Sequence, residues 1–276
     1  GKTAHVLTND KAFEAPPWMR GHNATTSFKY SLTGLWRFHR AHLVFFTHGL
    51  YFSWRSHRAQ QVVNLWHGMP IKRIGKLLGS NQGDLPSFDY TIAYSEKFRP
   101  IIASAFGIEQ EKVLISAHPR MDQMNRIVDL EGLKGPHNKF VVVWLPTYRQ
   151  SVRGQIRVDG RIDKDVLHSD LSQFDKAFRE FNAICFVKPH AMAEQSSPKQ
   201  RIYQNIVFLN ERELRRRDIS LYSLLGQADL LLTDVSSVYF DFKKLNRTTL
   251  LYCPDLEEYK QSRGFVEQLN SLIDDP

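Results

Sequence analysis

Short apolar stretches recur along the whole chain, separated by turn residues or by segments with helical spacing. Most of them have the length and composition of β-strands, and they cover residues 4–8, 42–47, 61–66, 90–94, 112–116, 140–145, 183–188, 206–209, 228–233 and 248–252. Several are continuously hydrophobic, which is typical of parallel strands buried on both faces. Residues 96–106 and 171–181 are predicted helices. The pattern therefore predicts a β-α-β chain of the α/β class.

A break in this pattern divides it into two halves. Residues 131–138 contain two glycines and a proline, which interrupt regular elements. About five strands precede the break and about five follow it, which favours two Rossmann-like domains facing across a cleft over one large sheet. We expect these domains to span residues 1–135 and 136–276. Ligands would then bind at the carboxyl ends of the strands.

One polar stretch, residues 150–170, is long for a connection in a compact domain. It follows the end of a predicted strand and contains three arginines and two glycines. Two interpretations stay open, a mobile active-site flap and a disordered insertion.

Length and composition are those of a globular protein. The chain has 276 residues, of which 42% are hydrophobic, with ordinary numbers of glycine and proline. No apolar run approaches the roughly 18 residues of a membrane-spanning helix, and no signal peptide opens the chain. Cys185 and Cys253 lie in apolar strand-like runs, which favours buried free thiols over a disulfide framework or a zinc site. We therefore expect a reducing, cytoplasmic location.

The net charge of +8 is concentrated in the first half of the chain. Residues 1–135 carry 17 basic and 10 acidic residues, against 20 and 19 in residues 136–276. No acidic residue lies between Glu14 and Asp84, a stretch where nine basic residues are interleaved with aromatic ones. This favours an anionic membrane surface, a phosphate-rich polymer or single-stranded nucleic acid as partner. The alternative is a solvated basic face over core aromatics.

A candidate general base follows the strand predicted at residues 61–66. His67 comes just past the strand end, and Gly68 lets the backbone turn sharply. An imidazole, with an ordinary pKa near 6.5, accepts a proton from an attacking hydroxyl near neutral pH. A structural turn is the alternative, since the His-Gly dipeptide also occurs at His48. Lys72 and Arg73 follow as candidate anion-binding cations.

Two further strands end in cations. Arg149 follows the strand at 140–145, and Lys188 and His190 close the strand at 183–188. Since parallel strands present their carboxyl ends at one edge, these side chains suit a phosphate cradle. Two unrelated surface cations are the alternative.

The run from Thr233 through Asp234, Ser236 and Ser237 joins a buried strand to an amphipathic segment. Serine or aspartate there caps a helix, and a helix N-terminus also favours an anion. Capping alone would explain the run equally well. The chain has neither a glycine-rich dinucleotide fingerprint nor a P-loop, which disfavours nicotinamide dehydrogenases and P-loop NTPases.

Taken in order, these motifs resemble the CDP-glycerol glycerophosphotransferase family, the teichoic-acid primases and polymerases. The matching motifs are Leu65-Trp66-His67-Gly68, Tyr94-Ser95-Glu96, Pro119-Arg120, Pro146-Thr147-Tyr148-Arg149, Lys188-Pro189-His190, Thr233-Asp234-Val235-Ser236-Ser237 with Phe240-Asp241-Phe242, and Arg263-Gly264. The departures are His118, Val235 and Ala191, where the family usually has Gly, Tyr and Pro. They bear on substrate identity more than on fold. Relatives usually run further than Pro276, so we expect a trimmed catalytic piece.

The resemblance implies a GT-B fold with an acceptor-side, membrane-facing N-terminal domain and a donor-binding C-terminal domain. It also implies that an acceptor hydroxyl attacks the glycerol-bearing phosphate of CDP-glycerol and that CMP leaves. His67 would be the general base, with His190 as the second catalytic residue. The donor diphosphate would be held by Arg149, Lys188, Asp234, Ser236, Ser237 and Arg263, and the acceptor by Lys72, Arg73 and Arg120.

The same resemblance implies a lipid-linked polyphosphate acceptor at the inner face of the cell membrane, and no nucleic acid partner. No cluster of carboxylate, His or Cys residues has metal-ligand spacing, although a divalent cation could accompany the donor diphosphate. Two other functions stay open: a GT-B glycosyltransferase that uses a nucleotide sugar, and a noncatalytic module that binds RNA or anionic lipid. The polyol of the donor, glycerol or ribitol, is also open.

Overall fold

The computed structural model describes residues 3–11, 13, 15, 23–51, 57–81, 86–134, 139–147, 170–189, 203–254, 256, 265 and 266. The chain divides into two compact units, Gly1–His67 with Gly75–His118, and Gly68–Ile74 with Pro119–Pro276. The chain therefore enters the second unit twice, first over Gly68–Ile74 and then from Pro119 onward. The acceptor and donor roles expected for residues 1–135 and 136–276 stay a prediction.

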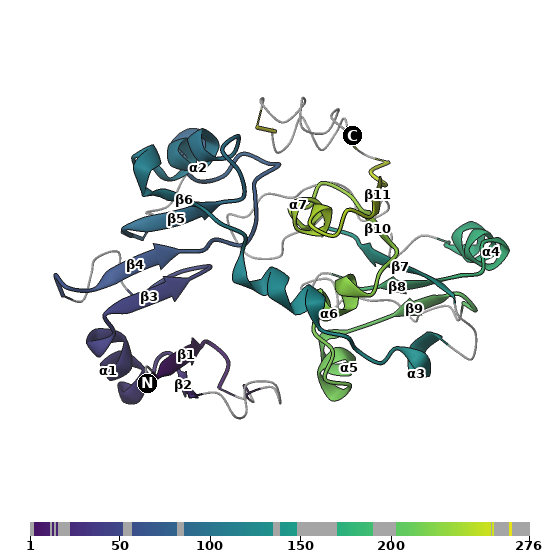
Figure 1. The fold of residues 1–276 in the computed structure, drawn as a ribbon, viewed down its shortest axis with the longest axis horizontal. Coiled ribbons are helices and arrows are strands. Elements are labelled where there is room, and N and C mark those ends of the chain that lie inside the picture. Colours follow the sequence, from purple (N-terminus) through teal and green to yellow (C-terminus); the bar gives the residue numbers. More distant parts are fainter. Residues whose placement is uncertain are drawn as a thin grey trace. The chain divides into compact units, whose positions relative to one another are not determined.

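The second unit is built on a five-stranded parallel sheet with the order β11-β10-β7-β8-β9 (Figure 1). Its strands are β7 (Phe140–Leu145), β8 (Ala183–Val187), β9 (Ile206–Phe208), β10 (Leu230–Thr233) and β11 (Thr248–Leu251). The chain starts in the middle at β7, runs outward to β9, and then returns to add β10 on the other side. A doubly wound sheet binds its ligands at this reversal, outside the carboxyl ends of β7 and β10.

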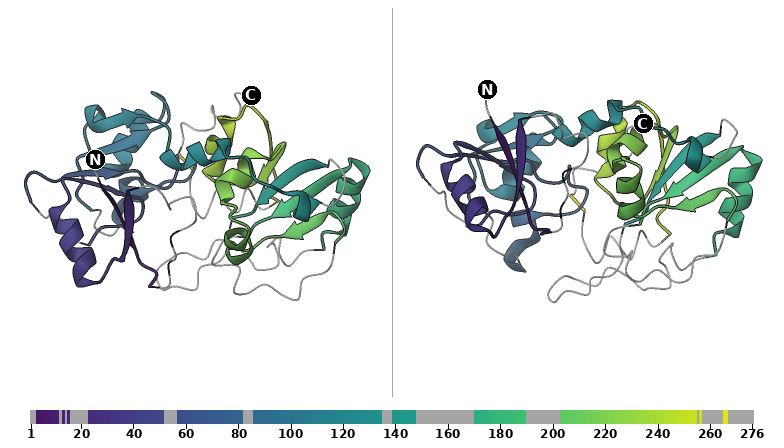
Figure 2. Two further views of the ribbon diagram at one scale, coloured as in Figure 1. Left: turned by 60° about the horizontal axis from the view of Figure 1, so that its bottom comes forward. Right: turned by 90° about the horizontal axis from the view of Figure 1, so that it is seen from below.

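Both faces of the central strands β7 and β8 are buried (Figures 1 and 2). On one face Val141, Val143 and Phe186 pack against helices α5 (Glu211–Arg216), α6 (Leu221–Gly226) and α7 (Val238–Lys243). On the other face Val142, Trp144 and Cys185 pack with aromatic residues of α4 (Ser172–Glu180). Because successive side chains alternate between faces, both sets must be apolar. This confirms the prediction of parallel strands from continuous hydrophobic runs.

Both cysteines are free thiols, as expected, but only Cys185 is buried; Cys253 is partly exposed and lies just beyond β11. Cys185 is fully buried on β8, and burial raises the pKa of its thiol. A protonated, enclosed thiol behaves as a small hydrophobic side chain.

The first unit holds a four-stranded parallel sheet with the order β3-β4-β5-β6. Its strands are β3 (Leu43–Phe46), β4 (Gln61–Asn64), β5 (Tyr90–Ala93) and β6 (Val113–Ile115). Helix α2 (Arg99–Phe106) has a proline in its first turn and ends at Gly107, which has a left-handed φ of 65°. Its buried side chains, Ile102 and Phe106 among them, cover β5 and β6.

A second parallel pair in this unit, β1 (Ala4–Thr8) and β2 (Ala24–Phe28), is followed by helix α1 (Leu32–Arg40). Ser31 caps α1 by accepting a hydrogen bond from Gly34 N at 3.0 Å. The sequence analysis did not predict β2 or α1, because the residues of β2 are mostly threonine and serine. The remaining short helices are α3 (Glu131–Lys134) and the 3-10 segments η2 (Gly75–Asn81), η3 (Gln110–Lys112) and η4 (Pro119–Asn125).

Within the residues that the structure describes, no helix has the length and apolar character needed to cross a membrane.

The packing of α6 on η4 predicts a sharp glycine requirement. A Cβ placed on Gly226 would lie 2.0 Å from the carbonyl oxygen of Met124, a backbone atom that cannot swing away. We expect Gly226→Ala to lower the free energy of unfolding by about 1–3 kcal/mol, measured by denaturant titration. Gly132→Ala is the matched control, because the nearest atom there belongs to the flexible side chain of Arg217, at 3.3 Å. Equal stability of both variants would contradict this packing.

Candidate functional site

Asp234, directly after β10, connects the ends of β7 and β10, the two strands at which the second sheet reverses its winding. Its Oδ2 accepts hydrogen bonds from Thr147 N at 3.1 Å and from Thr147 Oγ1 at 2.8 Å. Thr233 Oγ1 donates to the carbonyl of Leu145 at 2.9 Å. The buried carboxylate of Asp234 thus orients the loop after β7, the loop that leads to Arg149.

The serines that follow β10 have different local roles. Ser236 N donates to the Asp234 carbonyl at 2.8 Å, and Ser236 Oγ lies 3.5 Å from Val238 N. Ser237, directly before α7, has helical backbone angles and its side chain makes no capping hydrogen bond. Capping therefore accounts for Ser236 at most weakly, and it does not account for Ser237.

Gly68 lies against Ser237 within the second unit. Its φ of 132° is one that side chains rarely adopt, and a Cβ on Gly68 would lie 2.4 Å from Ser237 Oγ and 3.0 Å from an Nη atom of Arg120. Only glycine fits at this contact. The structure thus brings together Ser237 and Arg120, which the sequence analysis had placed on the donor and acceptor sides.

Arg120 is held by a buried carboxylate. Its Nη2 lies 2.6 Å from Oδ2 of Asp241, whose side chain is 0% exposed, whereas that of Arg120 is 20% exposed. The hydroxyl of Tyr222 donates to the same oxygen, and the guanidinium lies 5.1 Å from the centre of the Tyr222 ring. The sequence analysis quoted Asp241 only as part of a motif and did not identify Tyr222 at all.

His67 belongs to the first unit, directly before Gly68. Its ring contacts those of Trp66, with 4.0 Å between centres and 32° between planes, and His48, with 4.9 Å and 13°. His67 Nδ1 lies 3.4 Å from the carbonyl oxygen of Thr47. Because a carbonyl only accepts, Nδ1 is the donor when this hydrogen bond forms, and the neutral ring then carries its basic lone pair on Nε2.

His48 was taken as a chance His-Gly dipeptide, and the structure stacks it on His67. The signal was present in the order of strands, because β3 and β4 are parallel neighbours with Phe46 opposite Asn64. Residues that closely follow these two strands emerge at the same edge of the sheet.

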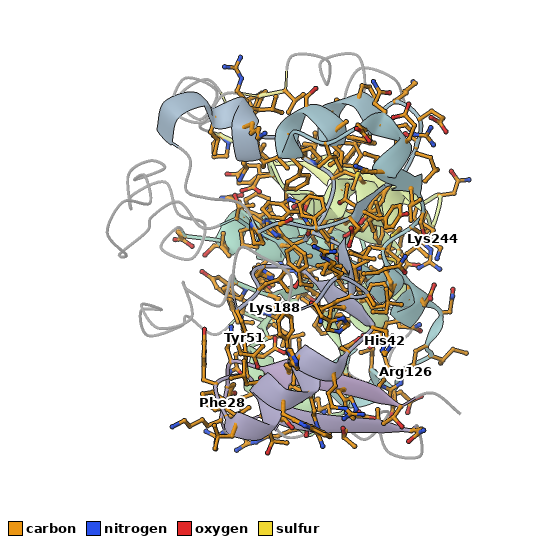
Figure 3. All side chains as sticks on the ribbon, turned by 90° about the vertical axis from the view of Figure 1, so that its left-hand side faces the viewer. Phe28, His42, Tyr51, Arg126, Lys188 and Lys244 are labelled. Atoms are coloured by element: carbon orange, nitrogen blue, oxygen red, sulfur yellow. The ribbon has the colours of Figure 1, made fainter. Side chains whose placement is uncertain are left out.

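Lys188, labelled in Figure 3, is 8% exposed and lies 3.5 Å from Oε2 of Glu211, the first residue of α5. A predicted phosphate-binding cation is therefore partly neutralised by an acidic neighbour that the sequence analysis missed. The pair is far apart in sequence, so no local pattern could reveal it.

Lys72 and Arg73 lie in Gly68–Ile74, the short early segment of the chain that belongs to the second unit. Lys72 forms an antiparallel bridge with Phe265, Arg73 Nε donates to the Phe265 carbonyl at 3.3 Å, and Val266 N donates to the Ile71 carbonyl at 3.1 Å. Their segment is therefore fixed by main-chain pairing. Their role toward an acceptor stays a prediction.

Three predicted site residues, Arg149, His190 and Arg263, lie outside the described residues, as does nearly all of the polar stretch 150–170. His118, a departure from the family pattern, is buried and its Nε2 lies 3.3 Å from the carbonyl of Trp66. In the described part of the chain, no three His, Cys, Asp or Glu side chains gather in a way that could hold a metal ion.

Comparison with known families agrees with this arrangement of motifs. The sequence model of the family described as CDP-Glycerol:Poly(glycerophosphate) glycerophosphotransferase matches residues 4–274. The chain belongs to this family. The resemblance inferred from the motifs is thereby confirmed.

Glycerophosphotransferase relatives include enzymes named for different polyols. A teichoic acid glycerol-phosphate transferase of Staphylococcus aureus is 26% identical over 241 residues, 76% of this chain and 57% of the relative. The ribitol-phosphate polymerase TarL of the same species is 26% identical over 248 residues, covering 82% and 41%. A teichoic acid glycerol-phosphate primase of Bacillus subtilis is 28% identical over 211 residues, covering 74% and 48%. The chain thus spans about half the length of these relatives.

Solved structures of the wall teichoic acid polymerase TagF share the fold of this chain. One has a TM-score of 0.69 at 20% identity and covers 95% of this chain and 65% of TagF. A second, of a TagF variant soaked with CDPG, has a TM-score of 0.73 at 18% identity, covering 99% and 67%. The predicted α/β fold of GT-B type is confirmed.

The contact at Gly68 predicts that the chain tolerates no side chain there. We expect Gly68→Ala to lower the free energy of unfolding by about 1–3 kcal/mol, because the backbone angle and the Ser237 contact both resist a Cβ. Gly49→Ala, in the other His-Gly dipeptide, is the control, since nothing lies within 4 Å of its Cβ position. A fully stable Gly68→Ala would show that the contact is not tight in solution.

Proposed function

We propose that this chain transfers a polyol phosphate, in the first instance glycerol phosphate, from CDP-glycerol to a hydroxyl of a growing teichoic-acid-like or capsule polymer, with release of CMP. The observation that carries the proposal is the family match over residues 4–274. It is supported by the cluster of Gly68, Arg120 and Ser237, three motif residues far apart in sequence.

In the proposed reaction, Nε2 of His67 accepts the proton of the acceptor hydroxyl. The resulting oxygen forms a bond to the glycerol-bearing phosphorus, and the bond from that phosphorus to the bridging oxygen breaks, so that CMP carries away the electron pair. Such transfers depend on positioning and charge neutralisation more than on covalent chemistry. We assign neutralisation to Lys188 with Arg149, His190 and Arg263, and phosphate binding to Ser236 and Ser237.

The Trp66 and His48 rings support the role of His67. An exposed imidazole samples several orientations, whereas one that contacts two aromatic rings and the Thr47 carbonyl samples fewer. A base whose Nε2 points in a fixed direction loses less entropy in the transition state.

We assign the acceptor and membrane side to the first unit. Helix α1 exposes Leu32, 88% exposed, and Trp36, 58% exposed, and Arg40 lies 5.3 Å from the Trp36 ring. Arg37 instead donates to the carbonyl of Thr26, at 3.2 Å, so it supports the fold. A helix with exposed apolar and basic side chains suits the interface of an anionic bilayer. The proposed location is the inner face of the cell membrane, where the acceptor is a lipid-linked polyphosphate.

The donor is left to experiment, because relatives of similar identity are named for glycerol phosphate and for ribitol phosphate. A nucleotide-sugar transferase and a noncatalytic anion-binding module are the competing functions. Calorimetric titration of the chain with CDP-glycerol, CDP-ribitol, UDP-glucose and CMP separates them without an acceptor.

We expect His67→Ala to abolish transfer while CDP-glycerol binds with unchanged affinity, because loss of a general base costs about 10²- to 10⁴-fold in rate but removes no donor contact. Transfer is measured as CMP release and donor affinity by calorimetry. His5→Ala, on the exposed strand β1, is the control. Near-normal turnover of His67→Ala would remove it as the base, and binding of UDP-glucose alone would replace the proposed class by a glycosyltransferase.

We expect the double variant Arg40→Gln/Arg58→Gln to bind anionic vesicles roughly thirtyfold more weakly, because each basic residue near such a surface contributes about 1 kcal/mol. Both side chains are exposed in the first unit. Co-sedimentation with phosphatidylglycerol vesicles at several salt concentrations measures this. The matched control is Arg179→Gln/Arg216→Gln, which removes two exposed charges from the second unit. Equal loss in both double variants would point to net charge and not to a docking face.

A further inference from the structure

Asp241 is a fully buried carboxylate for which the proposed reaction has no direct use. It lies on α7 and is bound by Arg120 Nη2 at 2.6 Å and by the hydroxyl of Tyr222. Replacing a buried ion pair by apolar residues is often neutral or stabilising, so stability alone is a weak reason for this arrangement. A buried carboxylate does, however, fix the plane and direction of a guanidinium.

The Arg120 guanidinium, held by Asp241, lies close to Ser237. Arg120 Nη2, the atom that also binds Asp241, lies 3.0 Å from the Cβ position of Gly68, and Ser237 Oγ lies 2.4 Å from it. That position is closed by the Gly68 backbone, but the two groups are near enough to each other to contact different oxygens of one phosphate group placed beside it. The Arg120 guanidinium also packs on the Tyr222 ring, 5.1 Å from its centre. The Arg120 side chain stays 20% exposed.

We propose that Asp241 and Tyr222 are positioning residues that hold the Arg120 guanidinium beside Ser237, so that Arg120 and Ser237 together bind a phosphate of the nucleotide donor. The inference rests on the proposed function and deepens it. It moves Arg120 from the acceptor, to which the family resemblance assigned it, to the donor. All four residues belong to the second unit, so the proposed contact needs no group from elsewhere.

The test compares donor affinity in Asp241→Asn with that in Asp218→Asn. Asp218 forms the other Arg–Asp pair of this region, with Arg126, and both of its side chains are about one-third exposed. We expect Asp241→Asn to weaken CDP-glycerol and CMP by about tenfold in calorimetry, the order of one charge-assisted hydrogen bond. Cytidine, which has no phosphate, should compete equally well with both variants and with the unaltered chain. Asp218→Asn should change none of the three affinities.

A purely structural role would weaken cytidine together with the phosphorylated ligands, and that result would overturn the inference. So would an unchanged affinity of Asp241→Asn for CDP-glycerol. Tyr222→Phe keeps the ring and removes only the hydroxyl, so it tests the same contact if Asp241→Asn does not fold; we expect a loss of about threefold. Failure of the unaltered chain to bind CDP-glycerol would instead contradict the proposed function.

Discussion

Burial of the central strands on both faces is the constraint on which the second unit depends. Apart from the exposed Phe140, every side chain of β7 and β8 belongs either to the cluster with α5, α6 and α7 or to the cluster with α4, so neither strand can carry a polar group in its interior without a large desolvation cost. Polar chemistry is therefore confined to the residues just beyond the strand ends. There the order of the sheet, with β10 beside β7, brings Thr147 and Asp234 into contact.

The elements that could be predicted from the sequence are those with an apolar signature. Strands β7, β8 and β10 follow from continuous hydrophobic runs, and α2 and α4 from helical spacing within a few residues of their observed bounds. Strand β2 carries no such signature, because Thr25, Thr26 and Ser27 form a strand through pairing with β1 and not through burial. Pairing partners are a property of the folded chain.

The candidate site divides in the same way. His67, Lys188, Asp234 and the two serines could be identified because each follows a strand end, a local feature. Arg120 was identified as part of a motif. The acidic partners could not be identified from the sequence, because Asp241 is 121 residues from Arg120 and Glu211 reaches Lys188 from the start of another helix. The sequence therefore indicates candidate groups, whose contact with a substrate stays a prediction, but not the side chains that hold them, which depend on tertiary packing.

Gly68–Ile74 belongs to the second unit although the chain on both sides of it belongs to the first, so the two units are not separate stretches of sequence. The chain crosses between the units at three places, after His67, after Ile74 and after His118, so no single cut yields two separable modules. A recombination event that exchanged only the C-terminal part would leave behind the Gly68 turn and Lys72, the residue that forms an antiparallel bridge with Phe265. Evolution of a new donor specificity in this fold is therefore expected to proceed by substitution within the chain rather than by exchange of a contiguous cassette.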